Sequence, residues 1–138
     1  MLRTLFALIS GLFAMMIVTT IVALTSAKFL YAPPSGFNAA DVAQLRALVG
    51  AMPVPVLALL VASWCAAAFV GGGVAAKLAG RRPVTCALAI GAVVTAAQVP
   101  NALAIGYPAW AIAAGILLPI PLAWLAAALV QKGLASTR

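Results

Sequence analysis

The second apolar stretch of the chain decides the fold: residues 54–76 read VPVLALLVASWCAAAFVGGGVAA and contain no charged side chain. A helix that rises about 1.5 Å per residue needs about 20 such residues to cross a hydrocarbon core about 30 Å thick. Lipid offers the backbone no hydrogen-bonding partner, so a crossing segment must be helical. Three similar stretches lie at residues 4–27, 84–105 and 108–130. The sequence therefore predicts an all-α membrane protein, one domain over residues 1–138 in which four transmembrane helices form a bundle.

The composition agrees with a membrane protein. The chain is 67% hydrophobic and 7% charged, whereas a soluble domain carries about 25% charged residues. A net charge of +7 could indicate a nucleic-acid partner, but the basic residues lie between the apolar stretches and do not cluster. We therefore expect membrane lipids as partners, and no nucleic acid.

The distribution of Lys and Arg predicts the orientation, because cytoplasmic loops are enriched in these residues. Two basic residues, Lys28 and Arg46, fall on the side of the first long connection. Six fall on the side of the termini: Arg3, Lys77, Arg81, Arg82, Lys132 and Arg138. Both termini are therefore expected in the cytoplasm. The apolar run from Leu5 to Leu24 exceeds the 7–15 residues of a signal-peptide core, so it is expected to be a retained first span.

The connection over residues 28–53 is expected to contain a short external amphipathic helix. Asn38 is a candidate N-cap, and Phe37 and Val42 could form a hydrophobic staple across the first turn. Apolar residues recur at helical spacing on one face, namely Val42, Leu45, Val49 and Met52. Such a helix would lie on the outer membrane surface or cap the bundle.

Small residues recur every four positions in two of the spans. The second span carries Ala68, Gly72, Ala76 and Gly80, and the fourth carries Ala111, Gly115, Pro119, Ala123 and Ala127. Small side chains allow helix backbones to approach closely within lipid. Two interpretations follow, either packing of these helices inside the chain, which we favour, or a surface for another subunit. The Pro119-Ile120-Pro121 segment should also kink the fourth span.

Gln98 and Asn101 are the candidate polar patch of the third span. They lie three residues apart around Pro100, so they could share one helix face and satisfy the carbonyl that the proline leaves free. A structural hydrogen-bonding patch and a binding site are both compatible with this pattern, and the structural patch is favoured.

The residues that most enzymes require are absent from the sequence. It contains no histidine, its only acidic residue, Asp41, lies in the external connection, and no metal-binding or haem spacing is present. Acid–base catalysis and proton-coupled transport normally need ionisable groups within the bundle. We therefore expect no catalytic residue, no metal and no cofactor, and a protein that is not an enzyme.

The order of motifs resembles a family of small bacterial four-span membrane proteins without an assigned activity. The matching pieces are Tyr31–Gly36, Asp41–Leu48, Ala62–Trp64, Ala68–Gly72, Ala75–Ala79, Asn101, Tyr107–Trp110 and Leu118-Pro119. The resemblance implies the four-span fold and a bacterial inner membrane. It also implies a Glu and two His residues at the positions of Leu24, Lys28 and Tyr107, so any site that those residues form in the family is missing here.

Two functions fit these observations. The leading hypothesis is a non-catalytic accessory or scaffold subunit of a larger inner-membrane complex, photosynthetic or respiratory, bound to other membrane subunits. The alternative is a passive pore or a carrier for a small neutral or lipidic molecule, using Gln98, Asn101 and the kinked fourth span.

Overall fold

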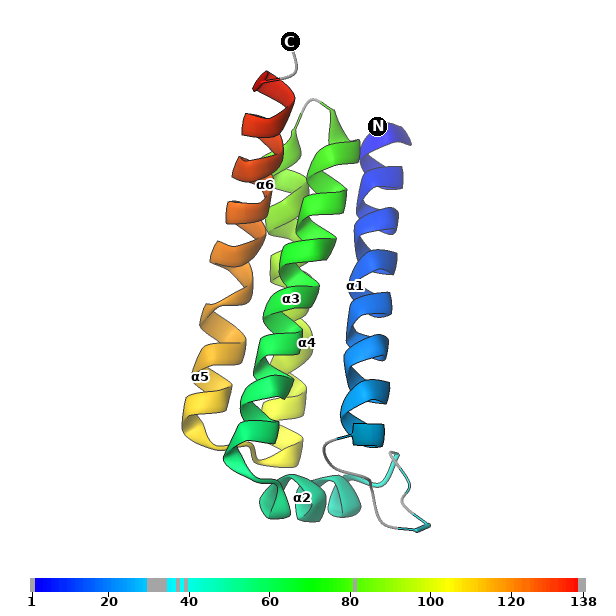
Figure 1. Ribbon diagram of the computed structural model, residues 1–138, viewed down its shortest axis with the longest axis vertical. Helices are drawn as coiled ribbons and strands as arrows, with labels where there is room; N and C mark the ends of the chain where they lie inside the picture. Colours follow the sequence, from blue (N-terminus) through cyan, green and yellow to red (C-terminus); the bar gives the residue numbers. More distant parts are fainter. Residues whose placement is uncertain (1, 30–34, 37, 39, 81, 137–138) are drawn as a thin grey trace.

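The structure is a computed structural model that describes residues 2–29, 35–36, 38, 40–80 and 82–136. The described residues form helices and no strand. In chain order these are α1 (Leu2–Phe29), α2 (Val42–Ala51), α3 (Val54–Ala79), α4 (Pro83–Ile105), α5 (Ala109–Leu117) and α6 (Pro119–Ser136). Figure 1 shows the long helices side by side, with α2 across one end.

Four segments of the described chain are helical, long and apolar enough to cross a membrane: Leu2–Ser26, Val54–Ala79, Pro83–Ile105 and Ala109–Gly133. They confirm the prediction of an all-helical chain with four candidate spans. The bounds differ from the predicted ones by up to three residues, at the ends of the second and the fourth span. The difference arises because hydropathy marks the hydrocarbon core, whereas α3 continues to Gly80, whose φ of 73° ends it.

The fourth span is interrupted at Leu118, between α5 and α6. Pro119 and Pro121 have no N–H, so the carbonyls four residues before them lose their helical hydrogen bonds. Leu118 keeps helical angles and donates its N–H to the carbonyl of Ala114 at 3.0 Å. The break in hydrogen bonding lies at the position predicted for a kink, and across it the two helices run on in a similar direction (Figure 1).

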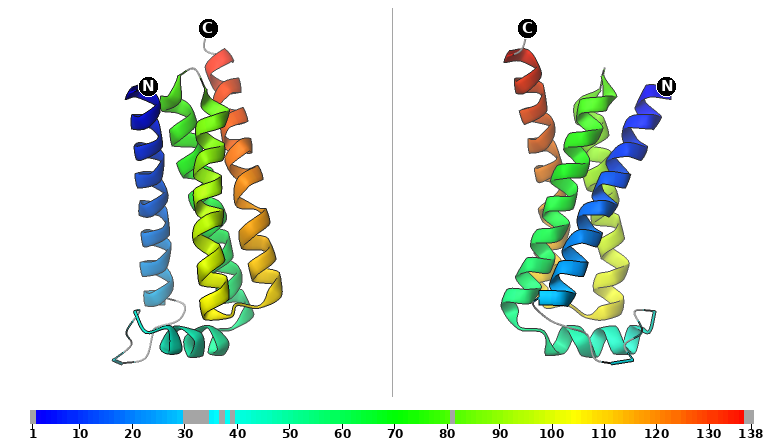
Figure 2. Two further views of the ribbon diagram at one scale, coloured as in Figure 1. Left: turned by 180° about the vertical axis from the view of Figure 1, so that it is seen from behind. Right: turned by 45° about the vertical axis from the view of Figure 1, so that its right-hand side comes forward.

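Helix α3 is the centre of the packing. The helices α3, α4 and α6 all contact one another, whereas α1 packs chiefly against α3 and to a lesser extent against α4. Figure 2 shows α1 and α6 on different sides of the α3–α4 pair. Helix α1 is consequently the most exposed of the four spans, with 11% of its most apolar window buried.

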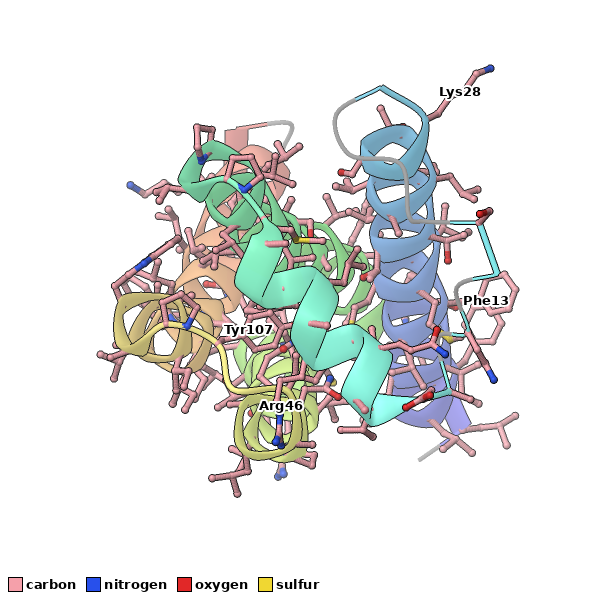
Figure 3. The ribbon with its side chains drawn as sticks, turned by 90° about the horizontal axis from the view of Figure 1, so that it is seen from below. Phe13, Lys28, Arg46 and Tyr107 are labelled. Carbon is pink, nitrogen blue, oxygen red and sulfur yellow. The ribbon has the colours of Figure 1, made fainter. Side chains whose placement is uncertain are left out.

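Helix α2 lies across the ends of α3 and α4, as Figures 1 and 3 show. Val49 of α2 is buried against Leu57 of α3 and Ile105 of α4. Arg46, one turn before Val49, donates a hydrogen bond from Nη2 to the carbonyl of Ala104 at 2.6 Å. Leu45 and Met52 are packed against the same cluster, whereas Val42 is 45% exposed.

The N-cap of α2 is Asp41, so the prediction of Asn38 as the cap was wrong. The Asp41 carboxylate accepts hydrogen bonds from the backbone N–H groups of Ala43 and Gln44. Asn38 instead forms a turn just before the helix, in which its side-chain oxygen accepts a hydrogen bond from the backbone N–H of Ala40. The predicted staple involves Phe37, which lies outside the described residues.

Candidate functional site

The two rows of small residues meet where α3 packs against α6. A Cβ added to Gly72 would lie 3.0 Å from the Cβ of Ala123, closer than side chains normally approach. One turn further along, Ala76 shares a buried cluster with Ala127 of α6 and Ala87 of α4. These positions are buried, so they are occupied by contacts within the chain.

The ends of the two rows serve other contacts. At the α5 end, a Cβ on Gly115 would lie 2.8 Å from the indole ring of Trp64. Trp64 packs edge-on against Tyr107, with ring centroids 5.6 Å apart, and Ala68 belongs to the same cluster. At the α3 end, Gly80 lies under the guanidinium of Arg3. The rows therefore organise several contacts and not a single interface.

Arg3 connects the start of α1 to the end of α3. Its Nε donates to the carbonyl of Leu78 at 3.1 Å, and carbonyls in the last turn of a helix have no partner within the helix. A guanidinium also interacts favourably with the negative end of the helix dipole. The contact fixes α1 beside the α3–α4 connection.

Gln98 and Asn101 occupy different environments. Gln98 is half-buried, near Gly115 of α5, and its Oε1 is buried with no hydrogen-bond partner among the described residues. Asn101 is exposed. The nearby polar group that does have a partner is Thr95, whose hydroxyl donates to the carbonyl of Ile116 at 3.3 Å, beside the break in the fourth span.

Sequence reasoning missed a closer approach between helices. A Cβ on Gly11 would lie 2.7 Å from the carbonyl oxygen of Gly71, so α1 and α3 touch through their backbones at this point. Gly11 is the only glycine of α1, which could have marked the crossing. No periodic row drew attention to it.

The outward face of α1 carries large apolar side chains. Phe13 lies two residues, or about 200°, from Gly11 and therefore points away from α3, as Figure 3 shows. It is 66% exposed. A shallow notch of about 240 Å³ lies beside it, lined by Met16, Ile17, Thr20 and Ile21.

The residues that make up this face follow a regular pattern. Intervals of four and three residues alternate along the helix, through Leu2, Phe6, Ile9, Phe13, Met16 and Thr20, and all six are exposed. A repeat that averages 3.5 residues is the pattern by which one helix packs along another. We call these six residues the α1 seam.

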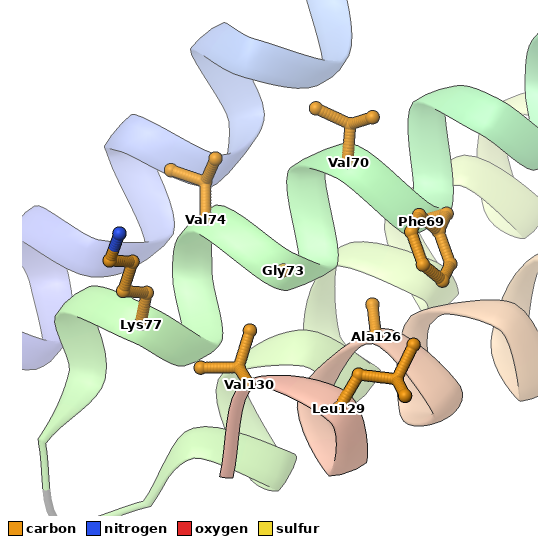
Figure 4. A pocket seen from close by; sticks show the side chains of 8 residues that line it. All are labelled: Phe69, Val70, Gly73, Val74, Lys77, Ala126, Leu129 and Val130. Atoms are coloured by element: carbon orange, nitrogen blue, oxygen red, sulfur yellow. The ribbon is translucent and has the colours of Figure 1, made fainter. Parts of the chain in front are cut away.

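A second surface feature is an open groove between α3 and α6 (Figure 4). Its volume is about 480 Å³, and apolar residues form almost all of its lining. Lys77 of α3 is the one charged residue among those that line it. Among the described residues, no group of three or more His, Cys, Asp or Glu could hold a metal ion.

Comparisons with known proteins found no match, so the evidence on function comes from the α1 seam and the groove between α3 and α6. No protein-family model matches the chain. No curated protein and no solved structure matches it either. The resemblance to small four-span bacterial proteins stays a prediction.

Proposed function

We propose that this chain is a non-catalytic accessory or scaffold subunit of a larger bacterial inner-membrane complex, photosynthetic or respiratory, and that the α1 seam binds a transmembrane helix of a partner subunit. The carrying observation is the seam itself, a heptad-like row of exposed side chains on the face of α1 opposite α3. Left-handed packing along such a row is common between membrane helices.

The small-residue rows are a less suitable partner surface. Gly72 and Ala123 already touch each other inside the chain, and a partner helix could reach them only by separating α3 from α6. The α1 seam can be covered without disturbing any internal contact, since Phe13 and Met16 are 66% and 58% exposed.

The hydroxyl group of Thr20 also favours a partner helix. The hydroxyls of Thr19 and Thr25 donate to carbonyls of their own helix, at 2.9 and 2.8 Å. Thr20 makes no such bond to any described residue. A threonine hydroxyl within lipid gains a hydrogen bond when a neighbouring helix supplies an acceptor, so a bound partner would satisfy it.

The orientation belongs to the same proposal. In the membrane the four spans would form a bundle with α2 on the external face and both termini in the cytoplasm. The start of α1, the α3–α4 connection and the end of α6 lie at one end of the molecule, opposite α2 (Figure 1). The end of the molecule opposite α2 carries Arg3, Lys77, Arg82 and Lys132, which supports a cytoplasmic location for this end by the positive-inside rule.

Site-specific photocrosslinking in native membranes tests the docking. A photoreactive phenylalanine analogue at Phe13 should give an adduct with one distinct membrane protein, identified by mass spectrometry. The matched control is Val93, an apolar residue of α4 that is 44% exposed, where only lipid adducts are expected. Equal protein adducts at both positions, or none at Phe13, would overturn the proposal, and an adduct with a second copy of this chain would replace the partner subunit by a homodimer.

A disruption experiment complements the crosslink. Phe13→Ala should weaken co-purification with the partner by about 2 kcal/mol if Phe13 is an anchor of the interface, whereas Val93→Ala should leave it unchanged. The alternative function, a pore or carrier, predicts flux of small neutral solutes across liposomes that contain the purified chain alone. Such flux would contradict a purely structural role.

A further inference from the structure

The groove between α3 and α6 has an unusual combination of an apolar floor and one cation. On α3 it is lined by Phe69, Gly73 and Lys77. On α6 the lining residues are Ala126, Leu129 and Val130. Figure 4 shows Lys77 at one end of this row, beyond Val74 and Val130.

The groove exists because two small residues lie where α3 and α6 begin to separate. The helices are in tight contact at Gly72 and Ala123, but a Cβ added to Gly73 would meet Ala126 at an ordinary 3.7 Å. Beyond this point the end of α6 diverges from α3, as the right-hand view of Figure 2 shows.

The dimensions favour a hydrocarbon chain over a protein helix. A helix with its side chains is about 10–12 Å in diameter, so it could cover the groove from outside but could not lie along its floor, where a Cβ on Gly73 would be 3.7 Å from Ala126. A single acyl chain is thin enough to lie along Gly73 and Ala126. The apolar lining would bury it as it buries an aliphatic side chain.

The charge of Lys77 has no acidic side chain of this chain to neutralise it. Lys77 is exposed and makes no ion pair or hydrogen bond with any described residue. The only acidic residue, Asp41, caps α2 at the opposite end of the molecule. An anionic lipid headgroup at this end of the groove would therefore meet no competing acidic side chain of this chain, and basic pockets between membrane helices bind such headgroups.

We propose that the α3–α6 groove is a binding site for an anionic phospholipid, with one acyl chain along Gly73 and Ala126 and the phosphate on the ammonium group of Lys77. The site is separate from the α1 seam and does not depend on a partner subunit. It adds a specific lipid ligand to the proposed scaffold role.

Native mass spectrometry of the delipidated full chain tests the site. Phosphatidylglycerol, which is anionic, should bind more tightly than zwitterionic phosphatidylcholine of the same acyl composition. Lys77→Gln should reduce phosphatidylglycerol affinity about fivefold, the effect expected of one lysine at a lipid surface, and should abolish the preference. Lys132→Gln removes the same charge at the same end but outside the groove lining, so binding should be unchanged.

The acyl chain is tested separately. Gly73→Leu should fill the groove and weaken both lipids, with circular dichroism and gel filtration verifying that the variant is folded. Glycerol phosphate, a headgroup without chains, should not displace the bound lipid. Equal losses for Lys77→Gln and Lys132→Gln would show a general surface attraction and overturn the proposal, as would unchanged lipid binding in folded Gly73→Leu. None of these outcomes affects the Phe13 crosslink, so the two proposals can fail independently.

Discussion

Gly11 of α1 and Gly71 of α3 contact each other backbone to backbone. A Cβ on Gly11 would lie 2.7 Å from the carbonyl oxygen of Gly71, and a Cβ on Gly71 would lie 2.8 Å from the carbonyl oxygen of Gly11. This reciprocal contact sets the distance between the two helices, since α1 packs chiefly against α3.

Gly11→Ala should therefore separate α1 from α3. Added volume in a packed contact costs about 1–3 kcal/mol, measurable as a loss of free energy of unfolding in mixed micelles. Gly50→Ala is the matched control, because nothing lies within 4 Å of its added Cβ and alanine is the better helix former. If Gly11→Ala proved as harmless as Gly50→Ala, the close crossing of α1 and α3 would be refuted.

Asp41→Ala should loosen the start of α2. The carboxylate accepts from the N–H of Ala43 at 2.9 Å, and loss of an N-cap costs about 1 kcal/mol. Faster hydrogen exchange of the amides of α2 would report it. Asp41→Asn retains a side-chain acceptor and should keep the protection, so equal exchange in both variants would argue against the cap.

Thr95→Val should weaken the contact between α4 and the broken fourth span. The variant removes the hydroxyl that donates to the carbonyl of Ile116 at nearly constant volume. Hydrogen bonds of this kind in membrane proteins average about 0.6 kcal/mol and reach about 1.7. Thr95→Ser keeps the hydroxyl and serves as the control, and a serine variant less stable than the valine variant would count against this role.

Tyr107 should make stability depend on pH in the alkaline range. The residue lies between α4 and α5, and burial raises its pKa above the ordinary value of 10. Above that value the unfolded chain loses the phenolic proton while the folded chain keeps it, so the free energy of unfolding falls as pH rises. Below it, both states are protonated and this residue contributes no pH dependence.

The comparison that isolates this effect is with Tyr107→Phe. Unfolding followed between pH 8 and 11 should show a steeper alkaline decline for the native chain than for the variant. Other groups titrate in the same range, but they are common to both proteins. Parallel curves would mean that Tyr107 titrates alike in both states.

Much of the fold could be predicted because a membrane span depends on a property of one segment. The stretch at residues 54–76 is apolar whatever it packs against, and the break before Pro119 follows from the missing N–H. The N-cap was harder to place, since Asn38 and Asp41 are both good caps. Which of the two residues caps the helix depends on which side chain the folded chain places next to the free N–H groups.

The surfaces proposed to be functional are less predictable because they depend on pairs of helices. The sequence shows that Gly72 and Ala123 are small, but not that they face each other. The α1 seam becomes apparent only when the contact of Gly11 identifies which side of α1 is internal. The sequence identifies Lys77 only as an orientation signal, because its place in a groove depends on where α6 diverges from α3.

The exposed position of α1 has a consequence for the order of assembly. Chains fold from the N-terminus as they are synthesised, so α1 enters the membrane before α3 exists. Its outward side chains, Phe13 among them, do not depend on any later helix for their arrangement. A partner that recognises the α1 seam could therefore bind the nascent chain on the ribosome, and α3 would then dock on the opposite side, with Gly71 meeting Gly11 on a helix that is already held in place.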